Sequence, residues 1–379
     1  MPKPINSDVV FFFGAGVSAP FGIPTMTQFV TDFEKLLFKE GAENEQQMYA
    51  EIKHNLERHL KKVDLEAIFT VIDGIVSFGP EKLGLLSTYL APQIKDVTDN
   101  DREIGKSLRL KFQKFVKKKC IIPQESFEKI GAVYHDFFNR FALEFPDGGI
   151  SKTGEYAFYD GWRMFTTNYD MCLEHYWHVK AGVGIDTGFE FDRAKNANTL
   201  RPERFLGNGG KQLLKLHGSV NWLIEEGTGE VIETEMTGIS HVGRRFVGEM
   251  MIYPIAEKEL YFDPYISMLL RLNRELQQKS IWVVIGYSFN DPVVREIFIR
   301  KSNATKHLVL VHPQANMVYK DQLNGLKAKT SLMEKRFGLQ ADSFADEQLK
   351  EEEFRKVNHQ IIHKLKASPR YSWEQTPLP

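Results

Sequence analysis

The sequence predicts an open α/β sheet of parallel strands flanked by helices, because short apolar runs alternate with segments of helical periodicity. The runs are rich in Val, Ile and Phe and show little alternation between polar and apolar residues. Such runs are typical of parallel strands that are covered on both faces. Helices are predicted between the later strands, at Ile266–Gln278 and Pro292–Lys301. The predicted strands are Val9–Phe13, Trp162–Thr166, Gln212–Leu216, Met250–Tyr253, Ile281–Ile285 and His307–Val311.

A large helical insertion is predicted after the first strand, because roughly 145 residues separate it from the second, far more than an ordinary crossover. Asp64–Val76 begins with Asp and carries apolar residues at helical spacing. Leu108–Lys119 is basic and amphipathic, and Phe127–Phe145 has a broad aromatic face. The expected parts are a sheet core at 1–30 and 160–315, the helical insertion at 31–159, and a C-terminal helical segment with a loose tail at 316–379.

Composition excludes several classes of protein. The 379 residues are 42% hydrophobic and 26% charged, which are ordinary globular values, and the net charge of −1 gives no global attraction to nucleic acid or to an anionic membrane. Two cysteines, Cys120 and Cys172, are too few for a disulfide framework or a cysteine-built zinc module. Because no signal-peptide core or membrane-length apolar run is present, we expect a cytoplasmic protein.

The first candidate site follows the first predicted strand and reads FGAGVS, Phe13–Ser18. Glycines here allow a tight turn and a close approach of the backbone to a phosphate at the start of a helix. Gly14, Ala15, Gly16 and Ser18 are therefore candidate cofactor-binding residues, although a plain tight turn has the same composition. The chain continues with Gly-Ile-Pro, which adds Ile23 and Pro24 to the candidates.

The second motif, FTTNYD, follows the second predicted strand, at the edge where ligands of open α/β sheets bind. The amide of Asn168 can place a water or hold a carboxamide, and Thr167 lies beside it. Asp170 can bind an amide or stabilise a developing positive charge. Asn and Asp are also ordinary turn residues, so a strand-end cap is the alternative interpretation.

Two further motifs follow strands. In LHGSVNW, His217 is a candidate general base, because imidazole exchanges protons near neutral pH. In IGYSFNDP, Gly286, Ser288 and Asn290 are candidate cofactor contacts. Asp291 in that motif has the pattern of a helix N-cap before proline, which ranks it below Ser288.

Together these four motifs resemble the sirtuin family, in the same chain order. GAGVSAPFGIP resembles its opening motif, TNYD its Thr-Gln-Asn-Ile-Asp, His217-Gly218 its catalytic His-Gly, and GYS its Gly-Thr/Ser-Ser loop. The family's Phe-Arg after Gly-Ile-Pro is replaced here by Thr25-Met26. The resemblance implies a Rossmann-like core that binds NAD⁺ at the glycine turn and at the Gly286 loop, with Ile23-Pro24 near the nicotinamide end.

The two cysteines cannot build the four-cysteine zinc module of classical sirtuin deacylases. What remains is a resemblance to the sirtuin-like NAD⁺ hydrolases of bacterial antiphage defence. This implies an N-glycosidase that releases nicotinamide and ADP-ribose and needs no metal. By that resemblance His217 is the general base, Asn168 places the water or the ribose hydroxyls, and Asp170 orients nicotinamide.

Partners are also implied by the resemblance. About 65 residues follow the last predicted strand, too few for a separate sensor domain, so we expect activity to be controlled by homo-oligomerisation or by a partner. A chain of this kind resembles the NADase subunit that pairs with a HerA-type hexameric ATPase. Phe344–Leu365 could supply contacts or could be an ordinary solvated helix.

Three alternatives remain open from the sequence. The motifs could form an NAD or ADP-ribose binding module without turnover, or a protein deacylase without zinc. The basic run Lys111–Lys119 could contact nucleic acid, but such a run is usually one solvated helix face, so direct nucleic-acid binding is not expected. A preference for NAD⁺ over NADP⁺ is not decided by any residue in the sequence.

Overall fold

The computed structural model describes residues 5–59, 63, 65–77, 98–144, 161–182, 184–207, 210–234, 245–251, 263–335 and 347–366. The chain forms two compact units. Unit 1 comprises Met1–Ile23, Ile122–Met251 and Leu260–Pro379, and unit 2 comprises Pro24–Ile121 and Ile252–Glu259. Within the described residues, no helix combines the length and the apolar character that a membrane span requires.

Unit 1 is built on a six-stranded parallel sheet with the order β11-β10-β9-β1-β2-β5. The predicted fold class, a Rossmann-like parallel sheet flanked by helices with a helical region after the first strand, is confirmed. The chain moves outward from β1 to one side through β2 and β5, then returns to the other side through β9, β10 and β11. The strands are β1 (Val9–Phe13), β2 (Arg163–Thr166), β5 (Gln212–Lys215), β9 (Ile281–Ile285), β10 (His307–Val311) and β11 (Lys329–Met333).

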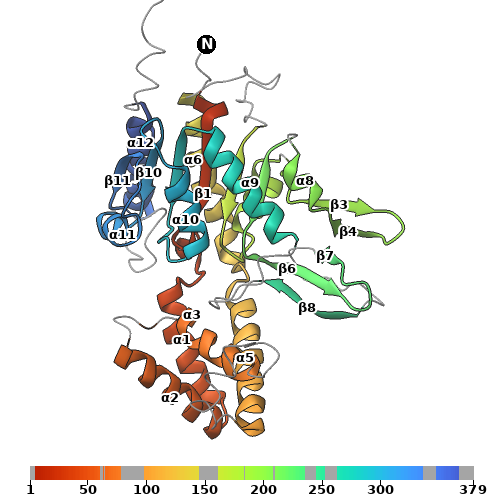
Figure 1. Cartoon of the computed structure of the whole chain (residues 1–379). Helices are drawn as coiled ribbons and strands as arrows, with labels where there is room; N and C mark the ends of the chain where they lie inside the picture. Colours follow the sequence, from red (N-terminus) through yellow and green to blue (C-terminus); the bar gives the residue numbers. More distant parts are fainter. Residues whose placement is uncertain are drawn as a thin grey trace, which may run out of the picture. The chain divides into compact units, whose positions relative to one another are not determined.

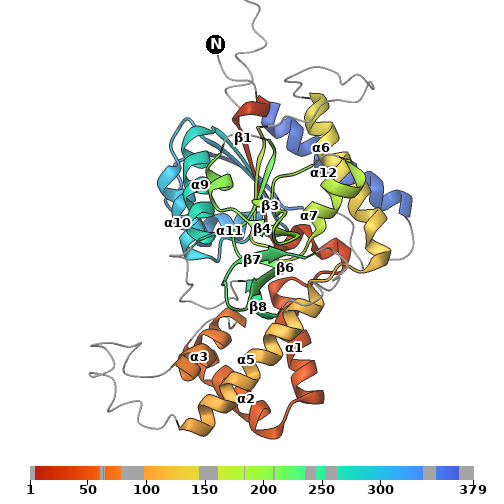
Figure 2. The same ribbon diagram turned by 90° about the vertical axis from the view of Figure 1, so that its right-hand side faces the viewer.

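Helices cover both faces of this sheet, with α9 and α10 on one face and α6 and α12 on the other (Figure 1, Figure 2). The longer helices are α6 (Phe127–Glu144), α9 (Tyr265–Gln278), α10 (Pro292–Lys301), α11 (Ala315–Gln322) and α12 (Glu347–Lys366). Shorter helical turns are η1 (Ile5–Asp8), η2 (Ala15–Val17), η3 (Ala19–Phe21), η4 (Gln124–Ser126), α7 (Cys172–His175), η5 (Tyr176–Lys180) and α8 (Glu203–Leu206).

Strand β1 explains this layering, since its three consecutive phenylalanines point alternately to the two faces. Phe11 packs edge-on against Phe137, Phe138 and Phe141 of α6. Phe12 packs instead on Phe298 of α10, and all three β1 rings are fully buried. Helix α6, which the sequence prediction put in the helical insertion, therefore supplies the aromatic cover of the sheet in unit 1.

A second, antiparallel sheet with the order β3-β4-β7-β6-β8 also belongs to unit 1. Its strands are β3 (Phe189–Asp192), β4 (Ala197–Leu200), β6 (Gly218–Glu225), β7 (Val231–Glu233) and β8 (Phe246–Met251). The segment from Glu225 to Gly248 contains the turn between β6 and β7, strand β7 itself and the start of β8.

For the six-stranded sheet, one predicted strand is wrong and one observed strand was not predicted. Met250–Tyr253 is wrong as a parallel core strand, because Met251 pairs antiparallel with Gly218, and residues 252 and 253 lie outside the described part. Strand β11 was not predicted, because Lys329, Thr330 and Ser331 make it too polar to resemble a buried strand.

Unit 2 is a group of four described helices, α1 (Met26–Glu40), α2 (Glu43–His59), α3 (Leu65–Ser77) and α5 (Asp99–Lys119). Its core is aromatic: the Phe33 ring contacts Tyr49, Phe69, Phe112 and Phe115. The predicted helix at Asp64–Val76 corresponds to α3, and Asp64 itself lies outside the described residues.

The basic run on α5 is partly neutralised inside unit 2. Lys111 pairs with the nearly buried Glu45, and Lys119 pairs with Asp32 at 2.8 Å. Charges held in such pairs attract a phosphate backbone less strongly than free ones.

Candidate functional site

The four motifs of the sequence analysis follow β1, β2, β5 and β9, so all four lie at the carboxyl edge of the six-stranded sheet. Strands β1 and β9 are neighbours, yet the chain leaves them toward opposite sides of the sheet. Open α/β sheets bind ligands at this point, where the strand order reverses. The carboxyl edge of the sheet around the ends of β1 and β9 is therefore the candidate site.

The glycines at the end of β1 and the glycine at the end of β9 fit closely against each other. A Cβ on Gly14 would lie 2.5 Å from the Gly286 oxygen, and one on Gly16 would lie 2.8 Å from the Gly286 Cα. Gly286 also has a φ of +66°, which favours glycine. These positions thus require glycine for contact between two loops, a reason that is independent of any phosphate.

Hydrogen bonds join the same two loops. The Gly14 amide donates to Ile285 O and the Gly16 amide to Gly286 O, each at 2.9 Å. The amides of Val17 and Ser18 donate back within the turn, to Gly14 O and Ala15 O. With those four amides donating to protein oxygens, the accessible surface of the turn lies at the half-buried residues Ala15 and Gly16.

Asn168 connects the second motif to the first. Its Nδ2 donates to Gly14 O and to Ser18 Oγ, each at 3.0 Å, and its main-chain amide donates to Thr166 Oγ1 at 3.0 Å. The side chain is half-buried, so it is fixed on one side and accessible on the other. Asn168 therefore meets Gly14 and Ser18 at one point, although it lies about 150 residues after them in the chain.

Asp170 is nearly buried, and its Oδ1 accepts a 3.0 Å bond from the Cys172 amide. This is the strand-end cap that was the alternative interpretation for the residue. Burial, with the nearby Asp170 carboxylate, raises the pKa of the Cys172 thiol well above its usual value. Cys172 is therefore a neutral thiol and not a nucleophile.

His217 pairs with Asp291, a contact that the sequence analysis did not predict. Nε2 of His217 lies 3.0 Å from Asp291 Oδ2, while Asp291 Oδ1 accepts from the amides of Val293 and Val294 and so caps α10. The Asp-Pro pattern predicted the cap correctly, but a cap uses only one carboxylate oxygen. Because the histidine partner is 74 residues away, no local pattern could have indicated it.

Gly218 follows His217 in the chain, and Tyr169 lies near it in space. Gly218 has a φ of +82°, and a Cβ there would lie 2.0 Å from Met250 O, so only glycine fits at this start of β6. The ring of Tyr169 lies 6.4 Å from the His217 ring, centroid to centroid. His217 and the Asn168 loop are therefore neighbours at the same edge.

The other predicted contacts are placed as follows. Thr167 donates its amide to Phe13 O at 3.4 Å, and Ser288 is half-buried and Asn290 exposed in the loop after β9. Phe289 between them is buried with a φ of +58°, a strained value for a residue with a side chain. Ile23 is buried at the end of the first segment of unit 1, and Pro24 is the first residue of unit 2.

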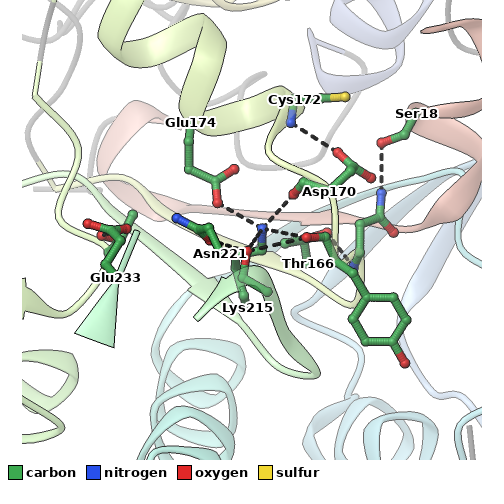
Figure 3. Close-up of polar contacts among 12 residues, drawn as sticks. Ser18, Thr166, Asp170, Cys172, Glu174, Lys215, Asn221 and Glu233 are labelled. Carbon is green, nitrogen blue, oxygen red and sulfur yellow. Dashed lines mark hydrogen bonds and ion pairs between the residues drawn. The ribbon is translucent and has the colours of Figure 1, made fainter. Parts of the chain in front are cut away.

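A buried polar cluster lies under these loops (Figure 3). Lys215 is fully buried and pairs with Glu174 at 2.8 Å. Ser219 and Asn221 continue the cluster through a 2.6 Å bond. At its far end, burial and the charge of Glu174 raise the pKa of Glu233 to about 7. The sequence analysis missed Lys215, because a lysine inside an apolar strand normally indicates an exposed position.

The arrangement of possible metal ligands is a further feature of the structure. Over the ranges that the structure describes, no group of three or more His, Cys, Asp or Glu side chains is arranged to hold a metal ion. The carboxylates nearest the site are already bonded, Asp170 to a main-chain amide and Asp291 to His217.

Part of the chain is similar to a known protein family. The family model described as the SIR2-like domain matches residues 163–333, from the start of β2 to the end of β11. The match includes Asn168, His217 and Gly286, and the glycine turn after β1 lies before it. No curated protein matches the chain.

Solved structures of Sir2 proteins are similar over most of the chain. A Sir2 homologue in complex with NAD is 13% identical, with 94% of this chain and 93% of that chain covered and a TM-score of 0.41. A variant Sir2 homologue in complex with ADP-ribose is 13% identical, with 95% and 93% covered and a TM-score of 0.39. Sir2Tm bound to a propionylated peptide is 10% identical, with 95% and 94% covered and a TM-score of 0.36.

Proposed function

We propose that this chain binds NAD⁺ at the carboxyl edge of the sheet, around the ends of β1 and β9, and hydrolyses its nicotinamide–ribose bond, giving nicotinamide and ADP-ribose. One observation carries the proposal: the Asn168 amide is fixed to the glycine turn while the His217–Asp291 pair stands on the adjoining loops. Sheets of this topology bind dinucleotides at this edge. The SIR2-like match over residues 163–333 supports the same class of ligand.

The proposed binding mode follows from accessibility. The half-buried residues Ala15 and Gly16 face the diphosphate. Ser288 and Asn290 offer a hydroxyl and an amide to the ribose groups. The strained backbone at Phe289 holds these two side chains in a fixed loop, which limits the entropy lost on binding.

The proposed reaction needs few groups, because nicotinamide leaves as a neutral molecule from a cationic one. The C1′–N bond breaks with its electron pair passing to nicotinamide, while ribose C1′ gains positive character. A water oxygen bonds to C1′ and its proton passes to His217. Asn168 places the water or the ribose hydroxyls, and Asp170 orients the nicotinamide amide.

The Asp291 carboxylate fixes the state of the base. When Nε2–H of His217 donates to Asp291, the basic lone pair is on Nδ1. The carboxylate also stabilises the imidazolium that forms as the proton arrives. Asp291, ranked low by sequence, is thereby added to the proposed catalytic group.

The proposed role in the cell comes from the sequence resemblance alone. We infer that the protein acts in the cytoplasm as an effector that depletes NAD⁺ during antiphage defence. Its proposed control is homo-oligomerisation or a HerA-type hexameric ATPase. Light scattering of the chain, alone and mixed with such an ATPase, tests this part. A strict monomer in both samples contradicts it.

The activity is tested by incubating the purified chain with NAD⁺ and identifying products by mass spectrometry, with and without the ATPase and with and without an acylated peptide. Nicotinamide and ADP-ribose without peptide are the expected products. O-acyl-ADP-ribose that forms only with peptide identifies a deacylase, and binding without any product identifies an NAD-binding module. His217→Ala should abolish product with folding intact, and unchanged hydrolysis by that variant contradicts the mechanism.

A further inference from the structure

Lys215, the last residue of β5, has a fully buried side chain two residues before His217. Its Nζ donates to Glu174 Oε1 at 2.8 Å, to Ser219 Oγ at 2.7 Å and to the main-chain oxygen of Asp170 (Figure 3). A weaker fourth contact reaches Tyr169 O at 3.2 Å. Its bonds therefore extend to both motif loops, the one with Asn168 and the one with His217.

Every N–H group of the Lys215 ammonium has an acceptor in this cluster. An ammonium has three N–H groups, which serve Glu174, Ser219 and the Asp170 carbonyl, with the Tyr169 carbonyl sharing one of them. Ser219 Oγ accepts from Lys215 and donates its own proton to Asn221 Oδ1 at 2.6 Å. A buried network with its lysine fully satisfied holds one arrangement.

Stability alone does not account for a lysine in this position. Taking a buried ion pair out of water costs about as much as the pair regains, so an apolar pair of similar volume is often as stable. What an apolar pair cannot do is bind two main-chain carbonyls and a serine hydroxyl at once. The specific contribution of Lys215 is therefore to fix the position of the loop with residues 169 and 170 relative to the segment with Ser219.

We propose that Lys215 is a positioning residue for the reaction: it sets the spacing between Asn168 and His217 by binding the carbonyls of residues 169 and 170 on one side and Ser219 on the other. The inference rests on the proposed function. Lys215 is buried under the loops and acts through them, without touching substrate. Misplacing a catalytic group by about 1 Å can lower turnover by roughly a hundredfold.

The test uses the double variant Lys215→Met/Glu174→Gln, which removes both charges and leaves no unpaired ion in the core. Turnover of NAD⁺ should fall by at least about tenfold while KM changes by less than about threefold, since spacing acts on the transition state. The melting temperature should fall to an extent comparable with that of the Lys306→Met control below, because the main-chain oxygens of residues 169 and 170 lose their donor.

Two further variants keep the result interpretable. Lys306→Met is the matched control, because Lys306 is also a buried lysine that donates to two carbonyls, Gln277 O at 2.7 Å and Lys279 O at 2.8 Å, but at the amino edge of the sheet. It should lower the melting temperature and leave kcat unchanged. Ser219→Ala keeps the ion pair and removes the Lys215 bond on the His217 side together with the bond to Asn221 Oδ1. We expect kcat to fall by several-fold with KM preserved.

The outcomes separate the two proposals. No NAD⁺ cleavage by the wild type, with its partner present, defeats the proposed function and the positioning role that depends on it. Cleavage by the wild type with unchanged kcat in the folded double variant overturns only the role of Lys215. If the double variant does not fold, unchanged kcat in Ser219→Ala overturns it instead. An equal loss of kcat in Lys306→Met also overturns it, because the effect then follows stability.

Discussion

Both edges of the six-stranded sheet hold polar side chains in hydrogen bonds, but the partners of these side chains differ between the edges. At the amino edge, Lys306 and Asp8 bond to main-chain groups beside β9 and so complete the backbone at the strand entry. At the carboxyl edge, Asn168 and His217 bond to groups of other loops and remain half-buried. Accessible polar groups fixed from behind are what a binding site needs, whereas the enclosed Lys306 and Asp8 complete the fold.

The largest expected effect comes from Gly286→Ala at the carboxyl edge. The new Cβ would lie 2.7 Å from Val17 N at a φ of +66°, so strain and overlap add. We expect the free energy of unfolding to fall by about 3 kcal/mol, and NAD⁺ turnover to be lost in the protein that remains folded. Urea unfolding followed by circular dichroism measures the first, and nicotinamide release the second.

Gly184→Ala is the matched control in the same unit, because a Cβ there meets no atom within 4 Å. Its stability and turnover should stay within experimental error of the wild type. Normal turnover in Gly286→Ala would show that the fit between the two glycine loops does not matter for the site.

The next effect separates the two roles of Asp291. Asparagine keeps an oxygen for the cap of α10 but removes the charge next to His217. For Asp291→Asn we expect kcat to fall on the order of a hundredfold, with a stability change below about 1 kcal/mol. Asp291→Ala should lose the cap as well. Equal kcat in Asp291→Asn and wild type would remove Asp291 from the proposed mechanism.

Asp291 also marks the limit of what the sequence predicts. Elements with a local pattern were predictable: the apolar strands β1, β9 and β10, the cap of α10, and the positions of Asn168 and His217 at strand ends. The His217–Asp291 pair was not, since it depends on how β5 and β9 are placed in one sheet.

Two other features were missed, the burial of Lys215 and the strand β11. Lys215 has the charge of a surface residue and is fully enclosed, so only the surrounding carbonyls explain it. Strand β11 is polar, and its place comes from pairing with β10 at the sheet edge. In both cases the deciding interactions come from residues far away in the chain.

At the amino edge, His307 should make stability depend on pH. Burial first, and then the charges of Lys329 and Lys364, lower its pKa to about 4, while Ser331 Oγ lies 2.9 Å from its Nε2. The unfolded chain therefore takes up a proton between about pH 6.5 and 4 that the folded chain does not. Stability should fall as pH drops through that range, by about 2 kcal/mol in all.

His307→Gln keeps a polar partner for Ser331 and has no such proton, so the Tm of the variant should fall less than that of the wild type between pH 7 and pH 5. Its turnover at pH 7 should equal that of the wild type, because the amino edge is not part of the site. A parallel fall of Tm in both proteins contradicts the assignment to His307.

The smallest expected effect has the opposite sign and belongs to the buried cluster under the carboxyl edge. Glu233 has a pKa of about 7 in the folded chain, raised by burial and by Glu174, so the folded state holds a proton that the unfolded state releases between about pH 4.5 and 7. Stability from this group is thus present at low pH and is lost as pH rises toward 7. Glu233 keeps some exposed surface, so we expect only about 1 kcal/mol. Glu233→Gln should therefore have a Tm close to that of the wild type at pH 5 and above it at pH 8. A difference in Tm that stays constant with pH would show that Glu233 is ionised throughout. The charge at this end of the Lys215 cluster would then already be balanced.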